Sequence, residues 1–166
     1  MVQSKIDSYT VPAINPRYIS IPQLNITKTR VTKVDVTSDC QHDVPRNIND
    51  TAWFKDSATP GSGVGAVLID GHNGGITKSG VFAKLSTLQA GDKIIIERGD
   101  GKKFTYGVVE NISMSLEEAN TSGMKKMTQS IESDKEGLSL ITSDGKWIPK
   151  YQQFGSRIML RATLSV

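Results

Sequence analysis

The stretch KIIIERGDGKKFTYGVVE, residues 93–110, contains two short runs in which apolar and polar side chains alternate. The segment Gly-Asp-Gly-Lys at 99–102 separates the two runs, and glycine-rich segments of this kind form tight turns between antiparallel strands. The stretch therefore predicts a β-hairpin with strands at 93–98 and 103–110. This hairpin indicates a β-rich fold, and the remaining strands must lie on either side of it in the chain.

Several other segments carry the period-two or short apolar patterns that are typical of strands. They are 17–21, which stops at Pro22, then 24–36, 64–69, 137–142 and 157–165. The proline- and glycine-containing region 37–63 predicts a loop, with Trp53 and Phe54 as its anchors. Many short strands without βαβ alternation predict an all-β fold, a closed or nearly closed β-barrel.

Two segments have helical spacing instead. Residues 80–88 place Val81, Phe82, Leu85 and Leu88 at helical intervals, and residues 115–133 predict one or two short helices interrupted by Gly123. The polar residues 1–16 are interpreted as an N-terminal arm, and residues 17–166 as a single barrel domain.

The composition places the chain among ordered globular proteins. It has 166 residues, 37% hydrophobic residues, 22% charged residues and a net charge of +3, which suits one domain and excludes a disordered chain. The densest basic cluster, Lys28, Arg30 and Lys33, is interpreted as a solvated strand face rather than a nucleic-acid surface. No stretch has the roughly 20 apolar residues of a membrane span, and a preceding anchor would lie outside this sequence.

The sequence offers no strong metal or nucleotide motif. Cys40 is the only cysteine, and a zinc site would need it together with His42 and His72 at a spacing that matches no common pattern. The glycine-rich segment 61–65 precedes a strand and does not open a helix, so it predicts a turn rather than a phosphate-binding loop. No metal site is expected from these residues.

Three chemically useful side chains stand next to predicted strands. His72 follows strand 64–69 among glycines, Ser143 follows strand 137–142, and Arg157 opens the last strand. Each alone is ordinarily a surface residue. Three strand ends can meet at one barrel rim, however, and there a nucleophile, a proton shuttle and an oxyanion-stabilising cation would suit acyl transfer.

From Arg17 to Leu164 the chain resembles the sortases, the cysteine transpeptidases of bacterial surfaces. The resembling segments, in order, are Ile-Ser-Ile-Pro at 19–22, Ala52-Trp53, Pro60-Gly61, Gly71-His72, GVFAKL at 80–85, GDKI at 91–94, Leu-Ile-Thr-Ser at 140–143, and Arg157. The resemblance implies a closed eight-stranded β-barrel with short helices. It also implies a peptide groove formed by the strands that end near residues 70 and 143, with segment 112–135 as a wall.

The resemblance further implies an activity. A sortase cleaves a sorting signal resembling Leu-Pro-x-Thr-Gly after its threonine and joins that carbonyl to an amine of a cell-wall precursor or a pilin lysine. His72, residue 143 and Arg157 would be catalytic, and Ile141, Thr142 and Arg157 would bind the peptide. The enzyme would lie at the extracellular face of the bacterial membrane, bound to the membrane only through an anchor outside this sequence, with no nucleic-acid partner.

Cofactors are not required by this resemblance. No organic cofactor is implied. Calcium binding by Glu117, Glu118 and Glu132, as in some family members, would rest on three scattered carboxylates, which is weak evidence.

One position departs from the family pattern, because Ser143 stands where the nucleophilic cysteine is expected. A hydroxyl ionises far less readily than a thiol, so the chain is expected to be an inactive or attenuated Cys-to-Ser form. Two alternatives remain open. The barrel could be a non-catalytic module that binds sorting peptides, or a serine hydrolase that uses Ser143 and His72 with Asp70 or Asp144 as the orienting carboxylate.

Overall fold

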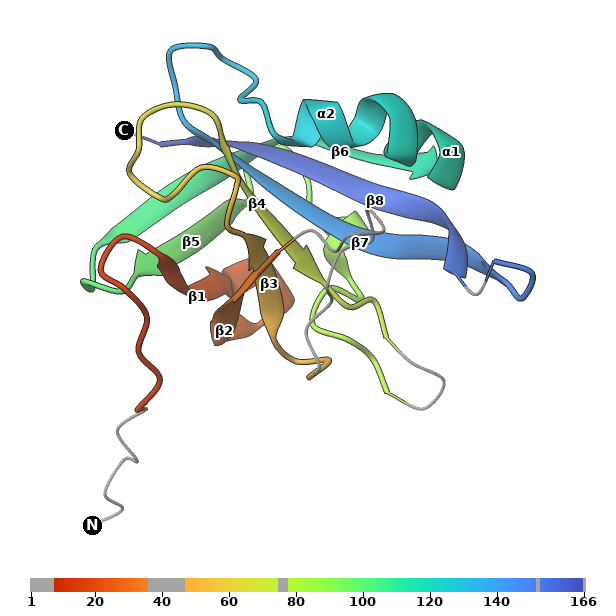
Figure 1. The fold of residues 1–166 in the computed structure, drawn as a ribbon, viewed down its shortest axis with the longest axis horizontal. Helices are drawn as coiled ribbons and strands as arrows, with labels where there is room; N and C mark the ends of the chain where they lie inside the picture. Colours follow the sequence, from red (N-terminus) through yellow and green to blue (C-terminus); the bar gives the residue numbers. More distant parts are fainter. Residues whose placement is uncertain (1–7, 36–46, 75–77, 152, 166) are drawn as a thin grey trace.

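The computed structural model describes residues 8–35, 47–74, 78–151 and 153–165, and their strands form a closed barrel (Figure 1). The strands are β1 (Pro16–Ile21), β2 (Ile26–Val34), β3 (Thr51–Phe54), β4 (Ala66–Gly71), β5 (Lys93–Arg98), β6 (Lys103–Ser115), β7 (Gly137–Ile148) and β8 (Gln153–Leu164). Their order is β1-β2-β3-β4-β7-β8-β6-β5, and β5 pairs with β1 to close the barrel. The predicted all-β, eight-stranded barrel is confirmed.

Two of the pairings are parallel and the others are antiparallel. β2 pairs in parallel with β3, and β4 pairs in parallel with β7. The predicted hairpin is present as β5 and β6, although β6 continues to Ser115, beyond the predicted end at 110. The parallel pair β4–β7 matters most for the site, because it brings residues about seventy positions apart in sequence onto neighbouring strands.

The buried side chains form two clusters on opposite faces of the sheet. The larger fills the barrel and includes Ile69, Phe82, Leu140 and Ile158. The second contains Phe54, Leu68, Met114, Ala119, Met127, Ile141 and Met159. It lies outside the barrel, under the short helical elements α1 (Leu116–Glu118), η3 (Ala119–Gly123) and α2 (Met124–Met127), which Figure 1 shows beside β6 and β8.

Three predicted boundaries were wrong in ways that have a local cause. Residues 51–54 form the buried strand β3, although they lie in a region predicted as loop, because four residues are too few to show alternation. Residues 80–88 form turns and the 3-10 element η2 (Leu85–Thr87) instead of a helix, yet Phe82, Leu85 and Leu88 are buried. Gly123 does not interrupt the helical segment, because it ends the π-helical turn η3 and α2 follows directly.

The last hairpin is longer than its sequence pattern predicts. β7 was expected to end at residue 142, but it runs through Asp144 and Gly145 to Ile148 and pairs with β8 along this extension. The register shifts between Asp144 and Trp147, and Gly145 has a φ of +80°, a backbone conformation that favours glycine. The Asp-Gly sequence therefore makes an irregularity within the strand and not a turn. The tip of the hairpin extends beyond the barrel (Figure 1).

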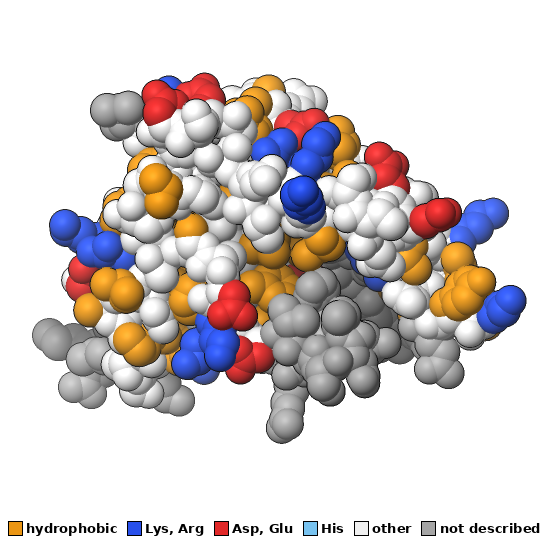
Figure 2. Space-filling view, turned by 45° about the horizontal axis from the view of Figure 1, so that its top comes forward, with side chains coloured by type: hydrophobic (Ala, Val, Ile, Leu, Met, Phe, Trp, Pro, Cys, Tyr) orange, Lys and Arg blue, Asp and Glu red, His pale blue; other side chains and the backbone are white. Residues whose placement is uncertain are grey.

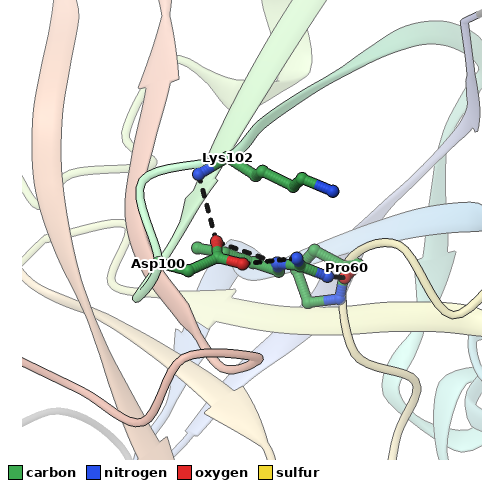
Figure 3. Close-up of polar contacts among 4 residues, drawn as sticks. Pro60, Asp100 and Lys102 are labelled. Atoms are coloured by element: carbon green, nitrogen blue, oxygen red, sulfur yellow. Dashed lines mark hydrogen bonds and ion pairs between the residues drawn. The ribbon is translucent and has the colours of Figure 1, made fainter.

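The glycine segment ahead of β4 forms turns, as expected, and one buried carboxylate holds it. Glu136 is 1% exposed and accepts hydrogen bonds from the backbone N–H groups of Gly61 and Gly63 at 3.0 Å and from the Tyr106 hydroxyl. Arg98 donates to the carbonyl of Pro60 at 3.1 Å while its guanidinium pairs with Asp100 (Figure 3). The turn before β4 is thus fixed to β5, to β6 and to the start of β7.

Part of the expected N-terminal arm is hydrogen-bonded to the barrel. The Tyr9 hydroxyl donates to the carbonyl of Val31 at 2.5 Å, and the N–H of Gly99 donates to the carbonyl of Asn15 at 2.9 Å. These bonds tie residues 8–15 to β2 and to the turn after β5.

Charged side chains of both signs are spread over the molecular face in Figure 2, with no single basic stripe among the described residues on that face. In the basic cluster on β2, Lys28 and Arg30 are exposed and lie over the rings of Tyr18 and Tyr9 at 5.8 and 5.1 Å. None of the helices in the described ranges combines the length and the apolar character needed to cross a membrane.

Candidate active site

Three neighbouring strands carry the residues that the sequence singled out. β4 lies beside β7, with Asp70 paired to Ile141, and β7 lies beside β8, with Ser143 paired to Arg157. The last pair of the β4–β7 ladder is Asp70 and Ile141, and His72 and Ser143 each follow it by two residues. His72 and Ser143 are therefore at equivalent positions in the two neighbouring segments.

The structure brings positions 72, 143 and 157 onto neighbouring segments, just beyond the last pair of the β4–β7 ladder. Ser143 and Arg157 lie within β7 and β8 and not at the strand ends that the sequence predicted, because the β7–β8 hairpin continues to Ile148 and Gln153.

The face on which these residues lie follows from strand alternation. Ile141 belongs to the outer apolar cluster, and residues two apart or directly paired across strands share a face. Asp70, Ser143 and Arg157 consequently lie on the outer face of the sheet, beyond the apolar cluster that α1 and α2 cover. Asp144, the next residue of β7, points to the opposite face, where its carboxylate accepts a hydrogen bond from the Ser113 hydroxyl at 3.4 Å.

The residues beside Ser143 have defined structural contacts. Thr142 is 2% exposed, and its hydroxyl donates to the carbonyl of Gly71 at 2.7 Å, which joins β7 to β4 one residue before Ser143. Ile141 is also buried, within the outer cluster. Ser143 itself is only half-buried. The substrate-binding roles of Ile141 and Thr142 stay predictions, and any contact with a peptide must be compatible with this burial.

The backbone of His72 is held by the segment that follows it. The carbonyl of His72 accepts a hydrogen bond from the N–H of Phe82 at 2.9 Å. Gly80 packs so closely that a Cβ atom there would lie 2.2 Å from the same carbonyl oxygen. The segment Gly-Val-Phe at 80–82 therefore holds the backbone of His72 in place, and only glycine at position 80 leaves room for the His72 carbonyl.

Arg157 is fixed by groups on its own strand. Its guanidinium donates to the carbonyls of Phe154 and Ser156 at 3.0 and 2.9 Å and to the side-chain oxygen of Gln153 at 3.3 Å. Burial lowers the pKa of Arg157, and the nearby Asp70 carboxylate opposes that shift. A half-buried, hydrogen-bonded guanidinium beside position 143 is a suitable donor for an oxyanion.

Asp70 is the residue whose place in the site the sequence did not show. Burial raises the pKa of Asp70 to about 7, while a hydrogen bond from the N–H of Gly71 and the charge of Arg157 act in the opposite direction. From sequence, Asp70 is a candidate only as a carboxylate that orients His72. The charge of Arg157 acts on Asp70 from β8, across β7, and no local sequence pattern indicates this relation.

The described residues give no support to a metal centre. Cys40 and His42 lie outside the described residues, so the candidate zinc set of these two with His72 has no geometry here. Glu117, Glu118 and Glu132 are all exposed, and Glu132 pairs with Lys135 at 2.8 Å. Within the described ranges, no group of three or more His, Cys, Asp or Glu side chains is placed to hold a metal ion.

Comparisons with known proteins agree with this architecture. The family model of the sortase domain matches residues 19–165. No match was found among curated proteins. Three similar solved structures are sortase C1 from Streptococcus agalactiae, sortase A from Corynebacterium diphtheriae and a sortase D5 transpeptidase from Clostridium perfringens.

The structural likeness is broad and the sequence identity is low. The TM-scores are 0.66, 0.67 and 0.62 and the identities 19%, 20% and 22%, in the same order. The matches cover 90%, 96% and 92% of this chain and 67%, 63% and 79% of the other chains. At these identities the solved structures establish the fold, and the chain spans about two thirds of the length of the first two.

Proposed function

The chain belongs to the sortase family, and from this premise we propose that its barrel is built for transpeptidation at position 143. The substrate would be a surface or pilin protein with a sorting signal resembling Leu-Pro-x-Thr-Gly. The acceptor would be an amine of a cell-wall precursor or a pilin lysine, at the extracellular face of a bacterial membrane. The observation that supports the proposal is the strand pairing that brings positions 72, 143 and 157 onto neighbouring segments beyond the last pair of β4 with β7.

The proposed reaction has two acyl-transfer steps. The side chain at position 143 passes its proton to His72 and attacks the threonine carbonyl carbon of the sorting signal, and the oxyanion that forms accepts hydrogen bonds from Arg157. The bond to the following glycine then breaks, and His72 gives a proton to the leaving amine. The resulting acyl-enzyme is an ester with Ser143, or a thioester with a cysteine. The acceptor amine gives a proton to His72, attacks this carbonyl and forms the new amide bond, and the side chain at position 143 leaves and takes its proton back from His72.

The serine limits the proposed rate and not the proposed geometry. A thiol has a pKa near 8.5, so a nearby cation makes thiolate available at neutral pH, whereas a serine hydroxyl must lose its proton during the attack. As the chain stands, we propose an attenuated or inactive enzyme that still binds its peptide. The proposal includes no cofactor and no calcium ion, and an anchor to the membrane would lie outside this sequence.

The test is to replace Ser143 by cysteine. With a quenched fluorescent Leu-Pro-x-Thr-Gly peptide, a panel of variant motifs and an amine acceptor, the Ser143→Cys protein should gain several orders of magnitude in turnover. Losses at a nucleophile–base unit reach about a millionfold. Adding His72→Ala or Arg157→Ala should remove most of this gain. Mass spectrometry of the intact protein would detect the acyl-enzyme.

The alternatives give different outcomes in the same assay. A folded Ser143→Cys protein that binds a peptide but releases no product would favour the non-catalytic binding module. Rapid turnover by the unaltered Ser143 protein would favour the serine hydrolase. For the hydrolase, Asp144 lies on the opposite face of β7 from Ser143, and the charge coupled to Asp70 is that of Arg157.

A further inference from the structure

We propose that Gln153 is a positioning residue for Arg157. Its side-chain amide holds the Arg157 guanidinium on the side of position 143 that faces the tip of the β7–β8 hairpin, and so keeps it from pairing directly with an ionised nucleophile. This inference rests on the proposed acyl transfer, because a fixed guanidinium has a purpose here only if negative charge develops on a bound substrate. Gln153 acts through Arg157 and not on the reacting atoms.

The hydrogen bonds of Arg157 all lead toward the tip of this hairpin. Nη1 of the guanidinium donates to the carbonyls of Phe154 and Ser156 at 3.0 and 2.9 Å, and Nη2 donates to Oε1 of Gln153 at 3.3 Å. These three residues precede Arg157 on β8, and their partners on β7 all follow Ser143. The hairpin extends beyond the barrel at this end (Figure 1), so the guanidinium is held on the tip side of the Ser143–Arg157 pair.

Gln153 is the member of this set whose contribution depends on the type of residue. The carbonyls of Phe154 and Ser156 are backbone groups that any residue would supply, whereas the Gln153 acceptor belongs to a side chain. All three acceptors are neutral, so they hold the guanidinium without cancelling its charge, as a carboxylate in the same place would. The cation therefore keeps its charge for the oxyanion that forms on the substrate.

The contacts also leave donors of Arg157 free for a ligand. An arginine side chain has five N–H donors in a planar fork. In the described part of the chain, Nη1 donates to two carbonyls, Nη2 makes one hydrogen bond and Nε makes none. The N–H of Nε and the second N–H of Nη2 remain available, and these are the donors that an oxyanion can accept.

Without this restraint the guanidinium would have a competing partner in the resting enzyme. A thiolate at position 143 carries its negative charge before any substrate binds, and position 143 is directly paired with Arg157 across β7 and β8. An ion pair between them would stabilise the resting state rather than the transition state, which does not accelerate the reaction. It would also lower the pKa of the thiol, and the nucleophilicity of a thiolate falls with that pKa.

The first measurement needs no sorting substrate. Alkylation by iodoacetamide across pH gives the apparent pKa of the thiol in the Ser143→Cys protein, with Cys40→Ala added so that only the introduced thiol reacts. Gln153→Met keeps the length of the side chain but removes the acceptor. The released guanidinium should then pair with the thiolate and lower the thiol pKa by about 1. In the Arg157→Ala background the same substitution should leave the thiol pKa unchanged. A thiol pKa that stays the same or rises in Gln153→Met would overturn the proposal.

The second measurement is a double-mutant cycle in turnover of the fluorescent sorting peptide. In the Ser143→Cys protein, Gln153→Met should lower kcat about tenfold, because a misplaced catalytic group is costly, with KM changed less than about twofold. Arg157→Ala should cost more, and adding Gln153→Met to it should lower kcat no further. Gln153→Glu keeps an oxygen acceptor at the same place, so kcat measured above the thiol pKa should stay within about threefold of the parent. Additive losses in the cycle would show that Gln153 acts independently of Arg157 and would refute its positioning role.

The matched control is Gln89→Met, at an exposed glutamine before β5, which should change neither the thiol pKa nor kcat. Thermal melting would verify that each variant is folded, and Gln153→Asn, which is one methylene shorter, is the second variant if the methionine protein does not fold. The other ionisable groups near the site are the same in every variant, so they cancel in each comparison; they are Asp70, His72, Glu117, Glu118 and Asp144.

The two measurements separate this proposal from the one on which it rests. If no peptide is turned over but the thiol pKa falls as expected, the acyl-transfer proposal fails while the positioning by Gln153 stands. If the Ser143→Cys protein turns the peptide over rapidly and Gln153→Met does not lower the thiol pKa, acyl transfer stands and the positioning by Gln153 fails.

Discussion

Replacing Glu136 should destabilise the fold more than any exposed acidic residue does. Its carboxylate is 1% exposed and accepts from the Gly61 and Gly63 N–H groups and from the Tyr106 hydroxyl. Glu136→Ala leaves the Tyr106 hydroxyl buried without an acceptor and removes the acceptor of two backbone N–H groups in exposed residues, Gly61 and Gly63, which water can reach. An unsatisfied buried donor costs about 1–3 kcal/mol and a lost hydrogen bond at a water-accessible donor about 0.5–1 kcal/mol, so the free energy of unfolding should fall by about 3 kcal/mol.

The same contacts predict a graded series. Glu136→Gln keeps one oxygen for the two glycine N–H groups and loses the charge, so about 2 kcal/mol is expected. Tyr106→Phe removes one partner and leaves the carboxylate with the backbone donors, at a cost of about 1–2 kcal/mol. Glu132→Ala is the matched control, because Glu132 is an exposed glutamate four positions away and its ion pair with Lys135 should contribute less than about 1 kcal/mol.

Thermal and urea denaturation would measure the series. For a chain of this length 1 kcal/mol corresponds to about 2–4 °C in melting temperature. Glu136→Ala should therefore melt about 6–12 °C below the parent, and Glu132→Ala within about 3 °C of it. A Glu136→Ala protein that melts with the Glu132→Ala control would refute the reasoning. Water would then replace the hydrogen bonds of the Glu136 carboxylate without a loss of stability.

Three further predictions concern the site and its surroundings. Because the pKa of Asp70 is about 7 in the fold and about 4 in an unfolded chain, the folded state binds the proton more tightly. The free energy of unfolding should therefore fall by up to about 4 kcal/mol as pH rises from 4 to 8. Urea denaturation at several pH values should show that the Asp70→Asn protein lacks this fall. If Asp70→Asn has the same pH dependence as the parent, the pKa of Asp70 is not raised in the folded state. Gly80→Ala should displace the backbone of His72, since its Cβ would lie 2.2 Å from the His72 carbonyl oxygen. Introduced into the Ser143→Cys protein, it should lower turnover of the sorting peptide at least tenfold. Unchanged turnover would show that the segment around residue 80 moves to accommodate the methyl group. Cys40→Ala should leave sorting-peptide binding unchanged by calorimetry, and lost binding in a folded protein would show that the thiol was wrongly dismissed.

Sequence patterns predicted the barrel because most strands are long enough to show their period. They failed where the determining contact is distant. β3 has only four residues, and its strand identity depends on pairing with both β2 and β4. The Asp-Gly at 144–145 is a common turn signal, yet β8 pairs with β7 on both sides of it. Pairing of this kind depends on contacts throughout the barrel, so it cannot be predicted from a short segment of sequence.

The candidate site shows the same division. His72, Ser143 and Arg157 were found as polar residues beside predicted strands, and the pairing of β4, β7 and β8 brings their positions together. Asp70 has no such signal, because it reads as the polar end of an apolar strand. Its relation to Arg157 follows only from the order β4-β7-β8, which joins segments that are far apart in the chain.

The parallel pairing of β4 with β7 also has a kinetic consequence. The hydrogen bond from Thr142 to the carbonyl of Gly71 joins residues 71 positions apart, so a large loop must close before this contact forms. Loop closure costs entropy that only later contacts recover, and folds with many distant pairings fold slowly. We therefore expect β4 and β7 to associate late in folding. Intermediates with the β5–β6 hairpin formed would still lack the site, so the capacity to bind a peptide should appear only in the final, slowest phase of refolding.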